Sequence, residues 1–345
     1  MTLIYFIIIL GVIIAIHEFG HFIFAKKAGI YVYEFSIGMG PVIFKKNRPN
    51  DETDYCLRLF PIGGFVQMAG EEIEDDKTVP KNKKFISKTF GQKFMTVIAG
   101  IMMNFVLAIV LLFIVGLVNG APQNKALVGE VDPSLPAYAA GIMEGDQILK
   151  VNGKNANTTD KLTLQLQLYQ GKPITFDVKR NGQVQQITVN PKKVEIEGET
   201  AYKYGFVISD EVHHGFFAAL KYSITKTISL IHQMIFIIYY LVIGKLSLGS
   251  LSGPVGIYTV VGDAASMGIL SLLYLTAYIS INVGFINFLP IPAFDGGRIL
   301  FLLIEKVKGS PVNPKLENTI HSIGLFLLLA LMIFVTYNDI IRLIK

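Results

Sequence analysis

The chain has 345 residues, 52% of them hydrophobic, and its mean hydropathy is +0.50. This composition excludes an ordinary soluble protein and predicts a polytopic α-helical membrane protein that lies in a lipid bilayer. The net charge of +5 is spread along the chain, which argues against nucleic acid as a partner, and the single cysteine excludes an internal disulfide bond and a cysteine-based zinc site.

The first expected element is an apolar run from Leu3 to Ala25, which is long enough to span a bilayer. No Lys or Arg precedes it and no small-residue cleavage motif follows, so we interpret it as a retained first span and not as a signal peptide. The run contains His17, Glu18 and His21 in the pattern H-E-x-x-H. A spacing of four residues puts both imidazoles on one face of a helix, where they can bind one Zn²⁺. Because ionisable groups at membrane depth are costly, we predict a metal site here.

Three further apolar stretches are predicted to span the membrane, at 94–118, 269–289 and 322–337. A polar stretch at 26–93 with twelve Lys and Arg residues separates the first two spans. Its middle, residues 55–68, mixes β-forming residues with glycines and a proline. We therefore expect a hairpin-like β element there.

The composition changes at about residue 121 to that of a small soluble domain, which we expect to end near residue 193. Two Asn-Gly pairs between short alternating segments indicate hairpin turns. The run from Ala139 to Gly153 resembles the PDZ domains attached to bacterial proteases. If this domain binds peptide, we expect strand addition to a sheet edge. The predicted strands and helix are at 147–151, 175–180, 184–189 and 159–169.

The stretch 216–244 is either a fifth span or an amphipathic helix at the membrane surface. The basic loop 26–93 is predicted to be cytosolic by the positive-inside rule, which leaves the PDZ-like domain outside the cell membrane. With four spans, the segment that ends at Asp295 reaches the depth of the two histidines. A fifth span would move Asp295 to the far face. We therefore favour four spans plus an interfacial helix.

The predicted architecture is a four-span α-helical membrane protein of the cell (inner) membrane. A cytosolic-side, membrane-associated β element and one inserted extracytosolic PDZ-like α/β domain complete it. The expected parts are an N-terminal membrane half with a membrane-dipping loop at 55–70 (1–120), the PDZ-like domain (121–193), a linker with the interfacial helix (194–268) and a C-terminal membrane half (269–345).

A catalytic zinc ion usually takes three protein ligands, so the two histidines need a partner. Glu34 follows too soon for the thermolysin-like pattern. The metzincin extension also fails, because Phe24 and Lys27 occupy its glycine and histidine positions. Asp295 remains as the candidate at matching depth. Judged from its own segment alone, Asp295 is explained equally well as a turn residue before two glycines and as a zinc ligand.

Two motifs together resemble one known family. H-E-F-G-H at 17–21 and N-F-L-P-I-P-A-F-D-G-G at 287–297 are similar to the site-2 protease family of intramembrane zinc metalloproteases, and more particularly to the bacterial regulator-of-sigma-E protease group. The resemblance also covers 58–66, 99–104 and 252–256. It implies that His17, His21 and Asp295 bind zinc and that Glu18 is the general base.

The chain departs from the family pattern at three points. Phe294 stands where a leucine is usual, and Ile101 stands where a proline is common. Neither position carries a catalytic group. One PDZ-like unit is expected here, where well-known Gram-negative members have two, so the way in which substrates are screened stays open.

Several residues near these motifs are candidates for binding substrate. Pro290 and Pro292 forbid a helix and free backbone carbonyls at membrane depth. Asn282 and Asn287 could donate to an oxyanion or to substrate backbone, and the resemblance implies a substrate-binding role for such asparagines. For Asn282 an interhelical polar contact is an equal alternative.

The second candidate group lies earlier in the chain. Members of the family use a loop like 63–66 to pair with an unwound substrate, and Gly63 and Gly64, followed by Phe65, would permit close backbone approach. Asn104 is also a candidate near the active site, although we favour a packing role for it.

The leading hypothesis is a zinc-dependent intramembrane endopeptidase that acts on single-span membrane proteins. By resemblance, expected substrates are membrane-anchored anti-sigma factors already shortened by another protease, and remnant signal peptides. The PDZ-like domain would exclude substrates with bulky outer domains. The alternatives are a non-catalytic membrane scaffold with a PDZ domain, which needs no metal, and a transporter with broken helices, which should contain internal repeats.

Overall fold

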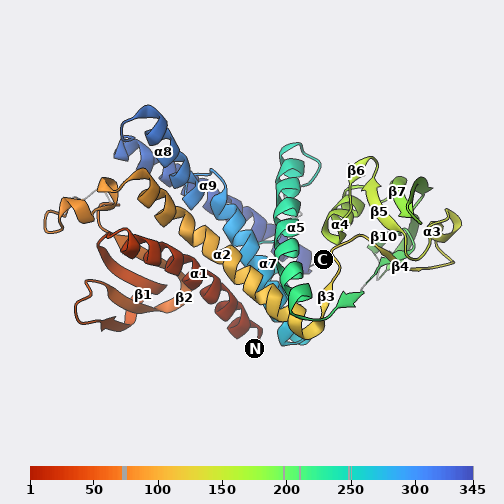
Figure 1. Cartoon of the computed structure of the whole chain (residues 1–345), viewed down its shortest axis with the longest axis horizontal. Coiled ribbons are helices and arrows are strands. Elements are labelled where there is room, and N and C mark those ends of the chain that lie inside the picture. Colours follow the sequence, from red (N-terminus) through yellow and green to blue (C-terminus); the bar gives the residue numbers. More distant parts are fainter. Residues whose placement is uncertain (72–75, 197–198, 210, 248, 250, 345) are drawn as a thin grey trace. The chain divides into compact units, whose positions relative to one another are not determined.

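The structure is a computed structural model that describes residues 1–345 except 72–75, 197–198, 210, 248, 250 and 345 (Figure 1). The chain divides into two compact units. Unit 1 comprises Met1–Leu111 and Leu248–Lys345, and unit 2 comprises Leu112–Ser247. Within the described residues, five helices are long and apolar enough to cross a membrane. Four of them lie at the spans predicted from sequence, and the fifth covers the ambiguous stretch 216–244.

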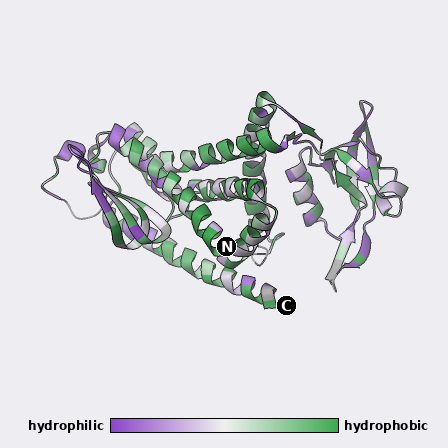
Figure 2. Cartoon of the chain, turned by 90° about the horizontal axis from the view of Figure 1, so that it is seen from below, coloured by the Kyte–Doolittle hydropathy of each residue, from purple (hydrophilic) through white to green (hydrophobic). Residues whose placement is uncertain are grey.

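The long helices are mainly hydrophobic along their length, as Figure 2 shows. The bounds of α1, α2 and α7 lie close to the predicted ones, whereas α9 extends well beyond its predicted span at both ends. The apolar run sets the span, and the neighbouring turns set the helix ends. Pro290 and Gly309 illustrate these ends: α7 stops just before Pro290, and Gly309 closes α8 in the left-handed conformation, at φ 76°. The helices of unit 1 are α1 (Thr2–Lys27), α2 (Phe90–Asn119, whose last turns belong to unit 2), α6 (Pro254–Ser266), α7 (Ile269–Phe288), α8 (Asp295–Lys308) and α9 (Pro314–Ile344).

Two apolar clusters hold these helices together. Ile9 and Ile13 on α1 pack against residues of α6 and α7, and Val97 and Ile101 on α2 pack against α8. In a bilayer such contacts hold helices together by van der Waals packing, since lipid tails are as apolar as the side chains themselves. As a result, the helix that carries H-E-x-x-H and the helix that begins at Asp295 are each fixed to neighbours by apolar contacts.

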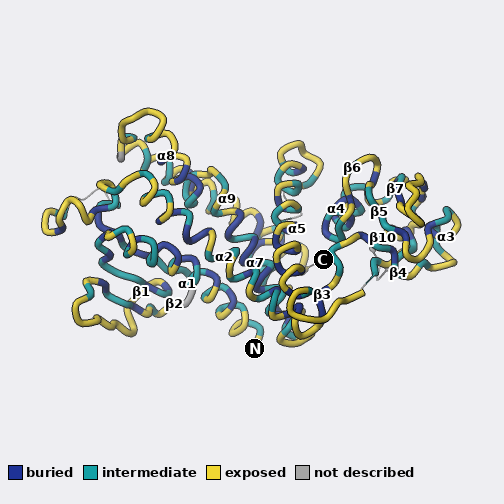
Figure 3. Tube along the Cα trace, viewed as in Figure 1, coloured by how far each residue is buried: buried dark blue, intermediate teal, exposed yellow. Residues whose placement is uncertain are grey.

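The polar stretch after α1 forms a larger sheet element than the expected hairpin. β1 (Val32–Asn47) and β2 (Asp54–Met68) are antiparallel and strongly bulged. Residues 32–37 pair with 64–68 on one side, and residues 34–37 pair with 54–57 on the other. Residues 64–68 therefore form an edge strand in the described part of this sheet. The far end of the hairpin is exposed (Figure 3).

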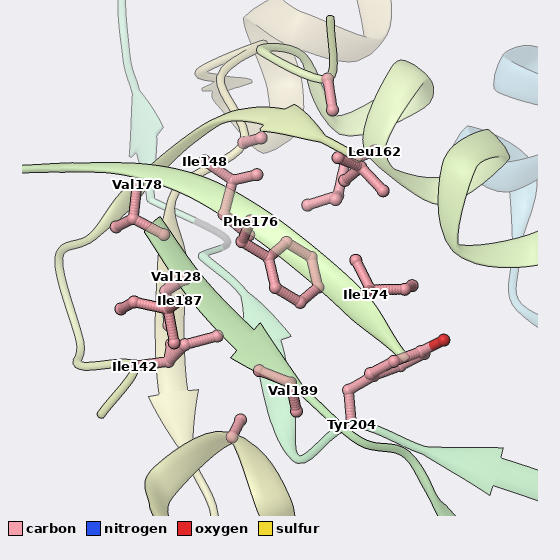
Figure 4. Close-up of a cluster of buried hydrophobic side chains, with 14 residues drawn as sticks. Val128, Ile142, Ile148, Leu162, Ile174, Phe176, Val178, Ile187, Val189 and Tyr204 are labelled. Atoms are coloured by element: carbon pink, nitrogen blue, oxygen red, sulfur yellow. The ribbon is translucent and has the colours of Figure 1, made fainter. Parts of the chain in front are cut away.

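Unit 2 contains the predicted soluble domain. The alternating segments form strands of one four-stranded sheet in the order β6-β5-β7-β8, and the predicted helix is α4. Figure 4 shows the ring of Phe176 among Ile148, Leu162 and Ile174 in the core. The bounds are β5 (Gln147–Val151), β6 (Lys154–Asn155), β7 (Ile174–Arg180), β8 (Gln183–Val189), α3 (Pro136–Ala139) and α4 (Thr159–Leu168).

The folded unit continues past residue 193, the predicted end of the domain. Tyr204 is part of the same core as Phe176, and β11 (Phe206–Ile208) pairs with β4 (Val128–Val131). This pairing joins residues about 75 positions apart, so short-range patterns could not reveal it. The remaining strands form two short pairs, β3 (Ala121–Pro122) with β12 (Val212–His213) and β9 (Lys192–Ile196) with β10 (Glu199–Lys203).

The ambiguous stretch forms α5 (Phe216–Val242), which belongs to unit 2 and packs along α4. Lys226 forms a buried ion pair with Asp160 at the start of α4, with Nζ 2.5 Å from Oδ1. Further along α5, the hydroxyl of Tyr240 accepts a hydrogen bond from Nζ of Lys154 over 3.0 Å. Polar contacts thus bind this apolar helix to the domain.

Candidate metal centre

The histidines of H-E-x-x-H lie one turn apart on the buried face of α1. Both His17 and His21 are buried, at 8% exposed. Their Nε2 atoms are 3.1 Å apart, because side chains four residues apart in a helix point the same way. The local spacing alone thus produces two ligand atoms that face one point.

Asp295 supplies a third atom at the same point. It is the first residue of α8, and its Oδ2 lies 3.0 Å from Nε2 of His17 and 3.3 Å from Nε2 of His21. Two segments from opposite ends of the sequence therefore meet here.

These three atoms fit a zinc ion. Zn–N and Zn–O bonds of about 2.0–2.1 Å in a tetrahedron separate neighbouring ligand atoms by roughly 3.3 Å. The observed separations are 3.0, 3.1 and 3.3 Å. In addition, Oδ2 of Asp295 has no hydrogen-bond donor among the described residues. Buried acceptor atoms that converge in this way are stabilised by a shared cation.

A stripe of residues on α2 orients both imidazoles. Nδ1 of His21 donates to the carbonyl oxygen of Thr96 over 2.9 Å, so its Nε2 is the unprotonated atom. The amide nitrogen of Asn104 lies 3.3 Å from Nδ1 of His17, and Oδ1 of Asn104 has no partner among the described residues. Exchanging the amide oxygen and nitrogen lets Oδ1 accept the Nδ1 proton of His17. Both histidines then present Nε2 to a metal.

Two glycines allow α1 and α2 to approach closely at this depth. A Cβ atom on Gly20 would lie 2.5 Å from the carbonyl oxygen of Ala99. A Cβ atom on Gly100 would lie 2.3 Å from Nε2 of His21. Thr96, Gly100 and Asn104 follow one another at intervals of four residues, so one face of α2 lies against the histidines. The sequence reasoning missed Thr96 and the role of Gly100, although this spacing was the signal for both.

An irregular segment between α7 and α8 carries the chain to Asp295. Leu289 leaves the helix with ψ 140°, since Pro290 follows it. The two glycines after Asp295 then fold beneath this segment: a Cβ atom on Gly296 would be 2.1 Å from the carbonyl oxygen of Leu289, and one on Gly297 would be 2.7 Å from that of Ile291. The Gly-Gly pair is thus required for the close turn that positions Asp295.

A cavity of about 260 Å³ opens beside two of the candidate ligands, His17 and Asp295. Glu18 and Asn287 reach it, together with Phe294. Asn282, Pro290 and Pro292 are not among its lining residues. Asn282 instead donates from Nδ2 to the carbonyl oxygen of Tyr278, one turn earlier in its own helix, over 2.8 Å. The cavity is lined by Ile14, His17, Glu18, Val283, Asn287, Ala293, Phe294 and Asp295.

The edge strand of the sheet passes next to Glu18. A Cβ atom on Gly64 would lie 3.2 Å from Cγ of Glu18 and 2.9 Å from the carbonyl oxygen of Ser36. Gly63 adopts φ +95°, a conformation that glycine accepts readily, and packs on Met39. Phe65 lies beneath the guanidinium of Arg58, 5.1 Å from it. Of these three candidates, the structure brings Gly64 to the candidate base.

Comparison with known proteins yields one family and several full-length relatives. The family described as peptidase family M50 matches residues 5–331. Zinc metalloprotease RasP of Geobacillus kaustophilus is 33% identical, with 98% of this chain and 97% of the relative covered. The regulator of sigma-W protease RasP of Bacillus subtilis is 33% identical, with 99% of each chain covered. A putative zinc metalloprotease of Clostridium perfringens, CPE1693, is 36% identical, again with 99% of each covered.

Proposed function

Because the chain belongs to peptidase family M50 and is a zinc-dependent, multi-pass membrane protease, we propose that it hydrolyses single-span membrane proteins within the bilayer through His17, His21, Asp295 and Glu18. The observation that carries this proposal is the convergence of the two Nε2 atoms and Oδ2 within 4.8 Å of one another. His17, His21 and Asp295 would hold the zinc ion, which when bound supplies a Lewis acid that polarises the scissile carbonyl.

Glu18 is the candidate general base. It lines the same cavity as His17 and Asp295, and its carboxylate is the ionisable side chain of H-E-x-x-H that does not take part in the three-atom cluster. In this position it would accept a proton from the attacking water and then donate it to the leaving amine. Asn287, which also lines the cavity, would donate a hydrogen bond to the oxyanion or to the substrate backbone.

Substrate must present an extended backbone to this cavity, because a transmembrane helix buries its carbonyls in internal hydrogen bonds. The edge strand 64–68 supports a way to do this. It runs beside Glu18, and Gly64 has no side chain between the strand and that residue. An unwound substrate segment would add to this edge as a further strand. Gly63 and Phe65 would then shape the strand, and Pro290 and Pro292 would keep the facing segment non-helical.

Asn104 has a different proposed role from the other polar candidates. Its amide lies behind His17, on the side away from Nε2. We therefore assign it to orienting this ligand, where the sequence alone favoured a packing role.

The four-span topology is part of the proposal, and the contacts of α5 support it. Lys226 and Tyr240 bind the soluble domain at positions about 21 Å apart along the helix axis. A helix that packs on a polar domain over this length cannot also cross a hydrocarbon core about 30 Å thick. Large apolar residues recur along α5 on an exposed stripe that suits the membrane interface: Phe217, Ile224, Ile228, Ile235, Tyr239 and Val242.

In this topology the PDZ-like domain would lie outside the cytosol and exclude substrates with bulky outer domains. Membrane-anchored anti-sigma factors that another protease has already shortened are the proposed substrates, together with remnant signal peptides. The name of the Bacillus subtilis relative, regulator of sigma-W protease, supports the first class. A scaffold without catalysis would not require three ligand atoms to converge beside a carboxylate.

The decisive experiment compares wild-type protein with Glu18→Gln for zinc content and for cleavage of a model single-span protein in detergent or liposomes. We expect Glu18→Gln to retain zinc and to lose cleavage, by about 100-fold or more. The proposal fails if Glu18→Gln cleaves at the wild-type rate, or if wild-type protein cleaves equally well after its zinc is removed.

A further inference from the structure

The backbone just before Asp295 is held in an unusual conformation. Ala293 has φ +87°, a value that residues with a side chain rarely adopt. Such a conformation persists only where the surroundings impose it, and it is found at sites where geometry matters. Ala293 also lines the cavity beside Glu18. The residues that contact this segment therefore determine the conformation of Ala293.

The contacts come from α9, the last helix of unit 1. Nδ1 of His321 accepts a hydrogen bond from the backbone N–H of Ala293 over 3.0 Å. Three residues further along the same face, Gly324 lies against Pro292: a Cβ atom on Gly324 would stand 2.4 Å from the carbonyl oxygen of Pro292. The side chain of His321 and the absence of one at Gly324 thus allow α9 to hold Pro292 and Ala293 in place.

His321 contacts the chain on both sides of Asp295. Its ring lies 5.6 Å from the ring of Phe301, which belongs to α8, the helix that begins at Asp295. Because Nδ1 accepts the proton of Ala293, the ring must be neutral with its own proton on Nε2. Nε2 has no hydrogen-bond partner among the described residues, and Oε1 of Glu317 lies 4.0 Å from it. The hydrogen bond from Ala293 is therefore the contact that sets the tautomer of the ring.

We propose that His321 and Gly324 are positioning residues for Asp295: they hold the left-handed Ala293, and through it they keep the Asp295 carboxylate within reach of His17 and His21. This inference rests on the proposed role of Asp295 as a zinc ligand. The contact of His321 with a strained residue two positions before the candidate ligand is what gives it this positioning role.

The test uses the full-length protein with four variants: His321→Leu, His321→Asn, the double variant His321→Leu with Ala293→Gly, and the control His232→Leu. His232 is an exposed histidine on α5. Each protein is assayed for zinc affinity by chelator competition, for kcat and KM on a model single-span substrate, and for Tm.

We expect His321→Leu to lower zinc affinity and kcat about 10- to 100-fold, with KM nearly unchanged. Asparagine places an acceptor oxygen near the position of Nδ1, so His321→Asn should retain most of the zinc affinity and most of kcat. Glycine adopts positive φ freely, so Ala293→Gly should restore part of the loss in the double variant. His232→Leu should match wild type.

The inference is overturned if His321→Leu keeps zinc affinity and kcat within twofold of wild type, or if it loses them and neither His321→Asn nor the double variant recovers any. The second result would mean that His321 only packs α9. Asp295→Ala in the same assays separates this failure from failure of the proposed function: if Asp295→Ala binds zinc and cleaves normally, the ligand assignment itself is wrong.

Discussion

Gly100 lies so close to His21 that a methyl group on it would stand 2.3 Å from the Nε2 atom of the histidine. This contact joins the second long helix to the candidate ligand on the first. Because no real Cβ atom approaches a ring nitrogen so closely, the absence of a side chain at position 100 is a condition for the position of His21.

The first prediction is that Gly100→Ala displaces the His21 ring. Zinc affinity and cleavage rate should each fall at least about 10-fold, while the protein still inserts and folds. Zinc stoichiometry and cleavage rate check it. Gly91→Ala is the matched control, since Gly91 lies on the same helix and a Cβ atom added to it would meet nothing within 4 Å. Equal activity of both variants would contradict the close packing of α1 and α2.

The second prediction concerns the ligand from the far end of the chain. Asp295→Ala should lower the zinc content of purified protein and abolish cleavage, because two histidines alone leave a catalytic zinc ion short of a ligand. Asp295→Glu should bind zinc in part, since it keeps the carboxylate but moves it by one methylene. Removing the metal from wild-type protein with a chelator should stop cleavage, and added Zn²⁺ should restore it. Zinc retained at full stoichiometry by Asp295→Ala would be inconsistent with this assignment.

How far the sequence predicts such a site depends on how local its geometry is. His17 and His21 meet because of helix periodicity alone, so H-E-x-x-H was sufficient to pair them. Asp295 required a second argument, that segments at equal membrane depth can meet. The structure brings it to 3.0 Å from His17, although its role as a ligand stays a prediction until zinc is measured.

Other features were beyond that reasoning because they depend on long-range packing. Gly64 approaches Glu18 only once the edge strand forms, and the pairing of residues 32–37 with two partners does not follow from alternation in one strand. The positive φ of Ala293 could not be predicted from sequence for the same reason, since alanine does not favour a positive φ. The extension of unit 2 to Tyr204 and β11 likewise depends on contacts between distant segments.

The third prediction tests how Asn104 acts on His17. Asn104→Leu removes the acceptor for the Nδ1 proton and should reduce zinc affinity or activity by about 10- to 100-fold. Asn104→Asp keeps an oxygen at that position, so it should retain more zinc than the leucine variant. Chelator competition measures both. If the aspartate and leucine variants bind zinc equally weakly, Asn104 contributes packing and not orientation.

The fourth prediction concerns the ion pair that joins α5 to α4 in unit 2. Asp160 and Lys226 are about one-tenth exposed, and Oδ2 of Asp160 has no hydrogen-bond partner among the described residues. Lys226→Met leaves this carboxylate buried without its cation, and removing one member of a buried pair typically costs about 3–5 kcal/mol. Hydrogen exchange should therefore become faster in β5 and β7 of Lys226→Met.

Replacing both members gives the sharper comparison, because the double variant Asp160→Leu with Lys226→Met has no buried charge left to desolvate. Its stability should return to near that of wild type. Lys221→Met is the control, since Lys221 is exposed on the same helix. If Lys226→Met exchanges no faster than Lys221→Met, α5 is not bound to the domain by this pair. The helix would then be free to cross the membrane, and the argument for four spans would lose its physical basis. Slower exchange in the double variant than in Lys226→Met, by contrast, would show that the unpaired Asp160 carboxylate is what destabilises the contact between α4 and α5.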